Sequence, residues 1–407
     1  MLFDTLPFML FLALTWVLWR TLGYGVMLLA ASIAFYVAAG WPDLLLVSVV
    51  VIVNYGMSFL VARQRYWLAA AIVSNLSVLA FFKYRAFLFG GIDSDMFTGG
   101  ILIPLGISFY IFQIIAYQVD IARGRCVQQA KFLNFALFVL FFPQLIAGPI
   151  MRAAALMPQV NRLLAQRRDS AYRCWNLALG LILLGLFKKA CIADSLSPHV
   201  DDIFARGPAD AATAWLGAWL FTFQIYFDFS GYSDMAVGMA RLFGIRLPFN
   251  FRQPYLSRSP REFWQRWHIT LSRWIRDYLY IPLGGSRSST VLQRSVVLVV
   301  TMALAGLWHG ADWSFVIWGC GWAAFILAWR LVPGSGNVHG AAGWAITLLI
   351  AVLLWVFFRS PDLASALGYF ATMFGGQAQG DWAVSFDGQQ GGWILVGAAL
   401  LIVLHPV

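Results

Sequence analysis

The sequence has 407 residues, of which 61% are hydrophobic and only 11% are charged. Uncharged or nearly uncharged stretches long enough to cross a bilayer recur from end to end, which excludes a soluble globular protein and indicates an all-α polytopic membrane protein. The formal net charge of +10 would suggest a nucleic-acid partner in a soluble chain. In a membrane protein, arginine and lysine gather in cytoplasmic loops, so we expect contact with membrane lipid and no nucleic-acid partner.

The hydropathy pattern predicts about 11 transmembrane helices within a single membrane-embedded domain over residues 1–407. The predicted spans are 6–19, 25–40, 44–62, 67–82, 101–119, 174–193, 212–230, 294–309, 314–330, 341–358 and 393–407. A further apolar stretch, 132–150, is interrupted by Phe142-Pro143 and Gly148-Pro149 and has basic flanks. We expect this stretch to be re-entrant, buried within the protein, and to return to the side from which it started.

The charged residues orient these spans. Arginines cluster at 63–65, 123–125, 152–173 and 241–294, all on one predicted side, whereas the other side is acidic or neutral and includes Asp202 and Asp381. The arginine-rich side is predicted to be cytoplasmic. The four cysteines are scattered without C-x-x-C spacing, so neither a metal site nor a disulfide framework is expected.

The basic segment 241–294 combines ten arginines with only Glu262 and Asp277. Trp264, Trp267 and Trp274 are interleaved with these arginines, a composition suited to a helix lying half in the membrane interface. Contact with anionic lipid explains most of the arginines. Some of them, with Arg266 and Arg276 as candidates, would instead bind the phosphates of an anionic cytoplasmic ligand.

His309 ends an otherwise uncharged run, Ser295 to Ala311, in a chain with five histidines. A titratable ring at membrane depth is costly and indicates a functional group. The alternative is a histidine that only hydrogen-bonds two helices together, and the local sequence does not decide between these interpretations.

A second histidine, His268, lies 41 residues earlier in the basic segment. The two histidines could face a shared channel from opposite ends. Upstream, a predicted helix pairs Gln224 with Asp228 and Ser230 with Asp234 at a spacing of four residues. Such a polar stripe must face the protein interior, where it has either a substrate-binding role or a purely interhelical one.

Five core motifs follow one another within residues 100–330. In chain order they are Phe142-Pro143-Gln144-Leu145-Ile146-Ala147-Gly148-Pro149-Ile150, Asp228-Phe229-Ser230-Gly231-Tyr232-Ser233-Asp234, Phe263-Trp264-Gln265-Arg266-Trp267-His268, Arg276-Asp277-Tyr278-Leu279-Tyr280-Ile281-Pro282-Leu283-Gly284-Gly285 and Leu307-Trp308-His309-Gly310. Together these motifs resemble the membrane-bound O-acyltransferase family, and most of all its bacterial alginate O-acetyltransferase branch.

The resemblance implies a multi-pass protein of the bacterial inner membrane whose helices surround a central channel, entered by an acyl donor from the cytoplasm and an acceptor from outside. It also implies that His309 is the catalytic histidine and His268 a second, supporting one. The remaining residues that we expect to bind substrate are Asp228, Ser230, Tyr232, Asp234, Arg266, Arg276 and Trp308.

The expected reaction is acyl transfer from a thioester to a hydroxyl, with neutral His309 as general base. The expected donor is acetyl-CoA or another acyl thioester, such as an acyl carrier, with no permanently bound cofactor. The expected acceptor is an exported polysaccharide, reached directly or through a periplasmic acyltransferase partner. Two alternatives remain: transfer of D-alanine from a carrier protein toward teichoic acid, and a non-catalytic transporter or flippase.

Overall fold

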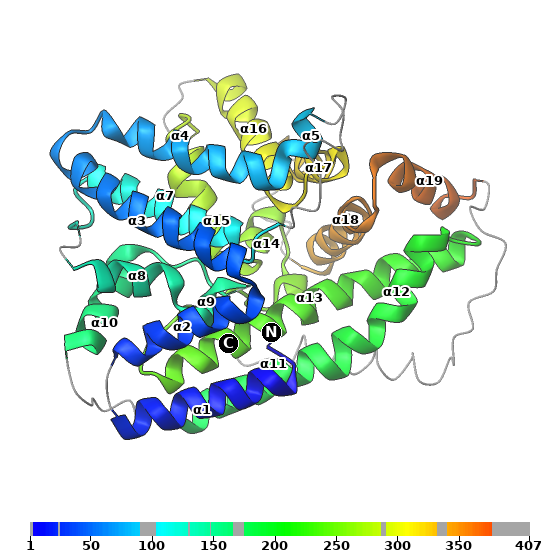
Figure 1. Ribbon diagram of the computed structural model, residues 1–407. Helices are drawn as coiled ribbons and strands as arrows, with labels where there is room; N and C mark the ends of the chain where they lie inside the picture. Colours follow the sequence, from blue (N-terminus) through cyan, green and yellow to red (C-terminus); the bar gives the residue numbers. More distant parts are fainter. Residues whose placement is uncertain are drawn as a thin grey trace. The chain divides into compact units, whose positions relative to one another are not determined.

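The computed structural model describes residues 3–22, 25–89, 103–128, 131–146, 148–165, 175–285, 290–331 and 340–376. Within these ranges every regular element is a helix (Figure 1). The chain divides into two compact units, one formed by Met1–Leu186 with Tyr232–Phe249 and the other by Phe187–Gly231 with Asn250–Val407. Neither unit is continuous in sequence, and helix α13 contributes residues to both.

The first unit contains helices from the N-terminal half of the chain and the end of α13. They are α1 (Leu6–Leu22), α2 (Val26–Ala39), α3 (Trp41–Arg63), α4 (Trp67–Leu79), η1 (Ala80–Tyr84), α5 (Arg85–Phe89), α7 (Ile107–Ala122), α8 (Phe132–Leu140), α9 (Phe142–Leu145), α10 (Ala153–Ala165) and α11 (Trp175–Leu186). Helix α7 packs against both α3 and α4 and is buried along most of its length.

The second unit contains the remaining helices and the larger part of α13. They are η3 (Phe187–Ala193), α12 (Asp194–Arg206), α13 (Ala211–Leu242), η4 (Pro254–Leu256), α14 (Pro260–Arg266), α15 (Ile269–Ile275), η5 (Arg276–Tyr280), α16 (Val291–His309), α17 (Trp313–Leu331), α18 (Ala341–Arg359) and α19 (Leu363–Met373). Its core is rich in aromatic side chains, among which Trp318, Trp322 and Trp355 are fully buried.

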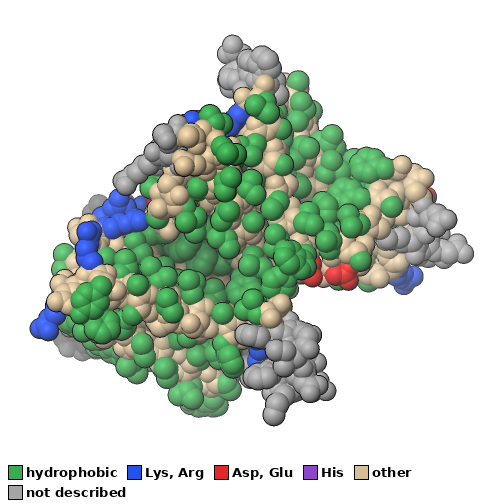
Figure 2. Space-filling view, turned by 90° about the horizontal axis from the view of Figure 1, so that it is seen from above, with side chains coloured by type: hydrophobic (Ala, Val, Ile, Leu, Met, Phe, Trp, Pro, Cys, Tyr) green, Lys and Arg blue, Asp and Glu red, His purple; other side chains and the backbone are tan. Residues whose placement is uncertain are grey.

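Six helices of the described residues are long and apolar enough to cross a membrane: Trp41–Arg63, Trp67–Tyr84, Trp175–Arg206, Val291–His309, Trp313–Leu331 and Ala341–Arg359. Hydrophobic side chains cover much of the surface in Figure 2, and large ones such as Leu45 and Ile52 of α3 are exposed. This pattern is expected when lipid, rather than water, contacts the helices.

The six helices match six of the predicted spans. Spans 6–19, 25–40 and 101–119 match shorter apolar helices, and 393–407 lies outside the described residues. The prediction for 212–230 ended too early, because α13 continues without a break to Leu242. The total of about 11 spans and the central channel stay predictions.

The interfacial interpretation of the basic segment is wrong for its tryptophans. Trp267 and Trp274 are almost completely buried, and Trp264 contacts the rings of Trp318 and Trp322 in α17. The segment forms short helices, α14 and α15, that pack into the second unit instead of one amphipathic helix on its surface. The sequence composition does not distinguish burial in protein from burial in lipid headgroups, because both environments suit tryptophan.

The interrupted stretch 132–150 forms two short helices, α8 and α9, that break at Phe141. The amide nitrogens of Gln113 and Gln144 each donate to the carbonyl oxygen of Phe138 at 2.8 Å, and the backbone nitrogen of Phe142 donates to the Ser32 hydroxyl at 3.2 Å. Polar side chains therefore satisfy backbone groups that the helix break releases, as a break inside an apolar environment requires.

Helices α16 and α17 form a hairpin held by close backbone contact. A Cβ atom added at Gly306 would lie 2.0 Å from the carbonyl oxygen of Phe315, and one added at Gly319 would lie 2.0 Å from that of Met302. Only glycine permits this approach, which is a common way to pack helices in membranes. The hairpin fixes the end of α16, where His309 lies.

Candidate functional site

His309 is the last residue of α16 and is half-buried. Its ring contacts three aromatic rings at steep angles: Trp308 with centroids 4.8 Å apart, Trp318 at 5.2 Å and Phe358 at 4.9 Å. These neighbours come from α16, α17 and α18. The imidazole is thus held by the packing of three helices while part of its surface remains accessible.

Helix α16 ends at His309, and Gly310 follows it as the C-cap residue. Gly310 has an extended backbone, and a Cβ atom there would lie 2.0 Å from the Phe315 ring. A larger residue would push Phe315 away or move the turn between α16 and α17. Gly310 therefore helps to place the histidine at the helix end.

His268 is the N-cap residue of α15 and is 1% exposed. Its backbone has φ 40° and ψ 56°, a left-handed conformation that costs free energy for a residue with a side chain. Neither ring nitrogen has a hydrogen-bond partner among the residues that the structure describes. Burial lowers the pKa of His268 from its usual 6.5 to about 3, so the ring is neutral at physiological pH.

Trp308 connects the two histidines. Its ring centroid lies 6.3 Å from that of His268 and 4.8 Å from that of His309. Phe229 of α13 stands edge-on to His268 at 4.6 Å. Trp308 therefore lies close to both histidine rings, and the shared channel that the two histidines would face stays a prediction.

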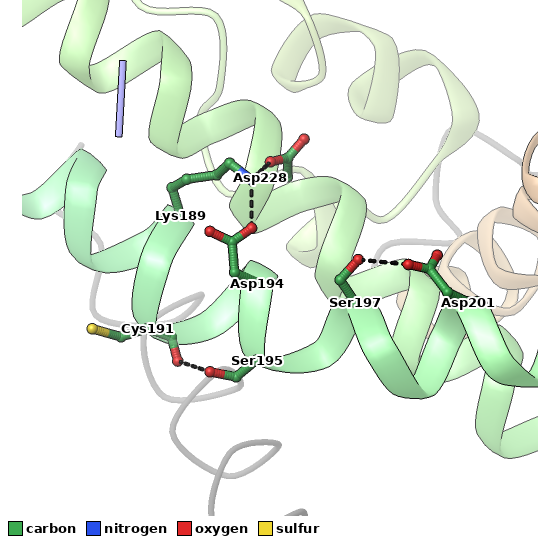
Figure 3. Close-up of polar contacts among 7 residues, drawn as sticks. All are labelled: Lys189, Cys191, Asp194, Ser195, Ser197, Asp201 and Asp228. Atoms are coloured by element: carbon green, nitrogen blue, oxygen red, sulfur yellow. Dashed lines mark hydrogen bonds and ion pairs between the residues drawn. The ribbon is translucent and has the colours of Figure 1, made fainter. Parts of the chain in front are cut away.

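Asp228 lies on α13 and forms an ion pair with Lys189 of η3 at 3.0 Å (Figure 3). Lys189 also pairs with Asp194, the first residue of α12, at 2.5 Å. The lysine side chain is 15% exposed, whereas the two carboxylates are 42% and 44% exposed. One half-buried cation thus joins two partly accessible carboxylates from different elements.

Sequence reasoning missed Lys189, although a signal was present. Lys188 and Lys189 are adjacent lysines inside the otherwise apolar predicted span 174–193. Charged residues within a span usually have a partner or a function. The π-helical turn η3, which contains both lysines, could not be read from the sequence.

The other predicted residues of the Asp228 motif lie on the same helix, α13. Ser230 belongs to the same unit as Asp228, is buried, and its hydroxyl has no hydrogen-bond partner in the described part of the chain. Tyr232 and Asp234 belong to the first unit, where Tyr232 packs against the Phe3 ring at 5.6 Å and Asp234 is buried. Their substrate-binding role stays a prediction.

The predicted phosphate-binding arginines already have carboxylate partners. Arg266 pairs with Glu262 at 2.6 Å, and Arg276 pairs with Asp277 at 2.7 Å. The hydrogen bond that Arg276 donates to the Asp277 carboxylate raises the pKa of Arg276. Six other arginines of the segment are exposed and form no ion pair within the described residues: Arg246, Arg252, Arg258, Arg261, Arg273 and Arg294.

The fold and the site together define a helical membrane protein with a candidate site in which aromatic side chains pack around His309. The family model of MBOAT, the membrane-bound O-acyltransferase family, matches residues 32–333. The chain therefore belongs to this family, and the resemblance found in its motifs is confirmed.

Similar proteins include acyltransferases with different acceptors. The chain is 41% identical to the probable alginate O-acetylase AlgI of Azotobacter vinelandii over 88% of this chain and 74% of that protein. It is 36% identical to the peptidoglycan O-acetyltransferase of Helicobacter pylori over 86% and 73% of the two chains. A teichoic acid D-alanyltransferase of Streptococcus thermophilus is 29% identical over 54% of this chain and 55% of its own length.

Proposed function

We propose that the protein is an O-acetyltransferase of the bacterial inner membrane that moves an acetyl group from a cytoplasmic thioester to a hydroxyl, for acetylation of an exported polysaccharide. The observation that carries this proposal is the placement of His309, half-buried at the end of α16 and linked through Trp308 to a second, neutral histidine. The extended similarity to O-acetyltransferases supports acetyl rather than another acyl group.

His309 would act as general base. Its imidazole accepts the proton of the acceptor hydroxyl while the hydroxyl oxygen attacks the thioester carbonyl carbon. The carbon–sulfur bond then breaks, the new ester leaves with the acceptor, and the proton passes from the imidazole to the thiolate. The thioester already provides a good leaving group, so the aromatic surround needs only to orient the reactants and limit water.

His268 would support this step while its imidazole stays neutral. A neutral imidazole has one N–H donor and one acceptor nitrogen. Because neither nitrogen is used within the described residues, the N–H is available to donate to the thioester carbonyl oxygen as negative charge develops there. Phe229 and Trp308 hold the ring in place for that contact.

The donor would approach over the exposed arginines. Arg258 and Arg261 flank the start of α14, and the backbone nitrogen of Arg252 donates to the carbonyl oxygen of Arg266, which brings the three arginines to the same short helix. Their charges are not neutralised by carboxylates of the described residues, unlike those of Arg266 and Arg276. They are therefore better placed to meet the phosphates of coenzyme A or the acidic surface of an acyl carrier.

Labelled donors test the proposal directly. Purified protein in liposomes should transfer label from [¹⁴C]acetyl-CoA to an acceptor hydroxyl, and not from a D-alanyl carrier protein. The D-alanyl alternative, favoured by the similarity to teichoic acid D-alanyltransferases, predicts the reverse preference. Transfer from neither donor under conditions where the protein is folded would contradict both thioester mechanisms.

The same assay tests the arginines. Arg258→Gln with Arg261→Gln should raise the KM for the donor by about tenfold, as the loss of charge-assisted contacts predicts. Arg246→Gln is a matched control, since it removes an exposed arginine of the first unit. An unchanged KM in the double variant would contradict a role in donor binding and would indicate that these arginines contact lipid instead.

A further inference from the structure

The first turn of α15 is capped in an unusual way. The first backbone N–H groups of a helix have no partner inside it, and the side chain of the N-cap residue normally accepts from one of them. His268 occupies this N-cap position but makes no side-chain capping bond. Its left-handed backbone and buried ring point to a different role for the imidazole.

Asn250 supplies the missing acceptors from a distant part of the chain. Its backbone carbonyl oxygen accepts from the Ile269 nitrogen at 2.9 Å, and its side-chain Oδ1 accepts from the Thr270 nitrogen at 3.3 Å and from the Thr270 hydroxyl at 2.6 Å. Asn250 is 1% exposed, so water cannot replace these bonds without opening the unit.

We propose that Asn250 is a positioning residue for His268: it caps α15 in place of the histidine and thereby leaves both nitrogens of the buried imidazole free of capping bonds. This inference rests on the proposed acyltransferase function. Asn250 touches neither histidine ring in any described contact. It acts on the two residues that follow His268 and so fixes the backbone from which the imidazole projects.

The strained backbone of His268 explains why the hydrogen bonds to Asn250 are needed. A left-handed conformation at a non-glycine residue persists only where the surrounding structure enforces it. Without the Asn250 acceptors, the free N–H groups of Ile269 and Thr270 would favour a relaxed turn with a different direction for the His268 side chain. The ring would then leave its contacts with Phe229 and Trp308.

The test compares variants of the two residues that share these hydrogen bonds, Asn250 and Thr270. Asn250→Ala should lower kcat per folded protein by about tenfold to a hundredfold, the range expected when a catalytic group is misplaced by about 1 Å. Thr270→Val removes the hydroxyl donor at nearly constant volume and should lower kcat several-fold, whereas Thr270→Ser keeps the donor and should restore it. Asp362→Ala, which removes an ordinary N-cap on α19, is the control and should leave kcat unchanged.

A double-mutant cycle separates positioning from general support of the fold. If Asn250 acts through His268, Asn250→Ala should have no further effect on kcat in a His268→Ala background. An equal loss in both backgrounds would overturn the inference. If Asn250→Ala does not fold, the Thr270→Val and Thr270→Ser pair takes its place in the same cycle, with the same two outcomes.

His309→Ala in the same assay distinguishes failure of the inference from failure of the proposed function. Full activity of His309→Ala would end the acyltransferase mechanism. An inactive His309→Ala together with independent effects of Asn250 and His268 would reject only the positioning role.

Discussion

The ring of Trp308 lies 6.3 Å from the ring of His268, at an interplanar angle of 61°. Trp308 immediately precedes His309, so this contact joins two histidines that are far apart in sequence into one site of the second unit.

Removal of the His309 imidazole should abolish acetylation without loss of the protein. Loss of a general base typically costs about 10² to 10⁴-fold in rate, or about 3 to 5 kcal/mol of transition-state stabilisation. We expect His309→Ala and His309→Gln to insert normally and to leave the exported polymer unacetylated. Polymer acetylation and membrane protein level are measured together.

His199→Gln is the control for that experiment, because it removes another histidine of the same unit, on α12. A transporter or flippase would keep its function in His309→Ala. Near-normal acetylation by a well-expressed His309→Ala protein would refute the general-base assignment.

Lys189 should stabilise the junction of η3, α12 and α13. Lys189→Met leaves Asp194 and Asp228 without their shared cation, and we expect a loss of about 1 to 2 kcal/mol, less than for a fully buried pair because both carboxylates are partly exposed. The measurement is thermal unfolding in detergent. Addition of Asp228→Asn should recover part of the loss, and the absence of any recovery would show that the pair is not coupled.

Stability should fall in acid because of His268. Its pKa is about 3 in the folded protein and 6.5 without the fold, so the unfolded chain binds a proton in this window and the folded chain does not. The contribution of the neutral ring is complete above pH 6.5 and is lost as the pH falls toward 3, by up to about 1.4 kcal/mol per pH unit. His268→Gln should flatten this dependence, and parallel pH profiles of wild type and variant would contradict the pKa shift.

The α16–α17 hairpin should not tolerate a methyl group at its closest contacts. Gly306→Ala and Gly319→Ala each place a Cβ atom 2.0 Å from a backbone oxygen, and we expect each to cost about 1 to 3 kcal/mol and to lower activity through His309. Gly56→Ala is a matched control in α3, where a Cβ atom has nothing within 4 Å. Melting temperatures of the three variants are compared, and equal stability of all three would contradict the close packing.

The protein class and the family were predictable from the sequence. Apolar stretches of membrane length predicted six of the observed candidate spans, because the hydrophobic requirement of a span depends only on local composition. The helix break near Phe142-Pro143 was also predictable, because proline disrupts a helix locally. Five ordered motifs identified the family, and His309 stood out because a titratable residue is rare in an uncharged run.

How these residues meet depends on tertiary packing. The contact of His268 with Trp308, the pairing of Lys189 with Asp228 and the capping of α15 by Asn250 all join residues that are far apart in the sequence. Composition could not separate the buried Trp267 from a lipid-facing one, or the paired Arg266 from the exposed Arg261, because each pair has the same chemistry and differs only in its neighbours. Long-range packing selects those neighbours, and local sequence preferences do not record it.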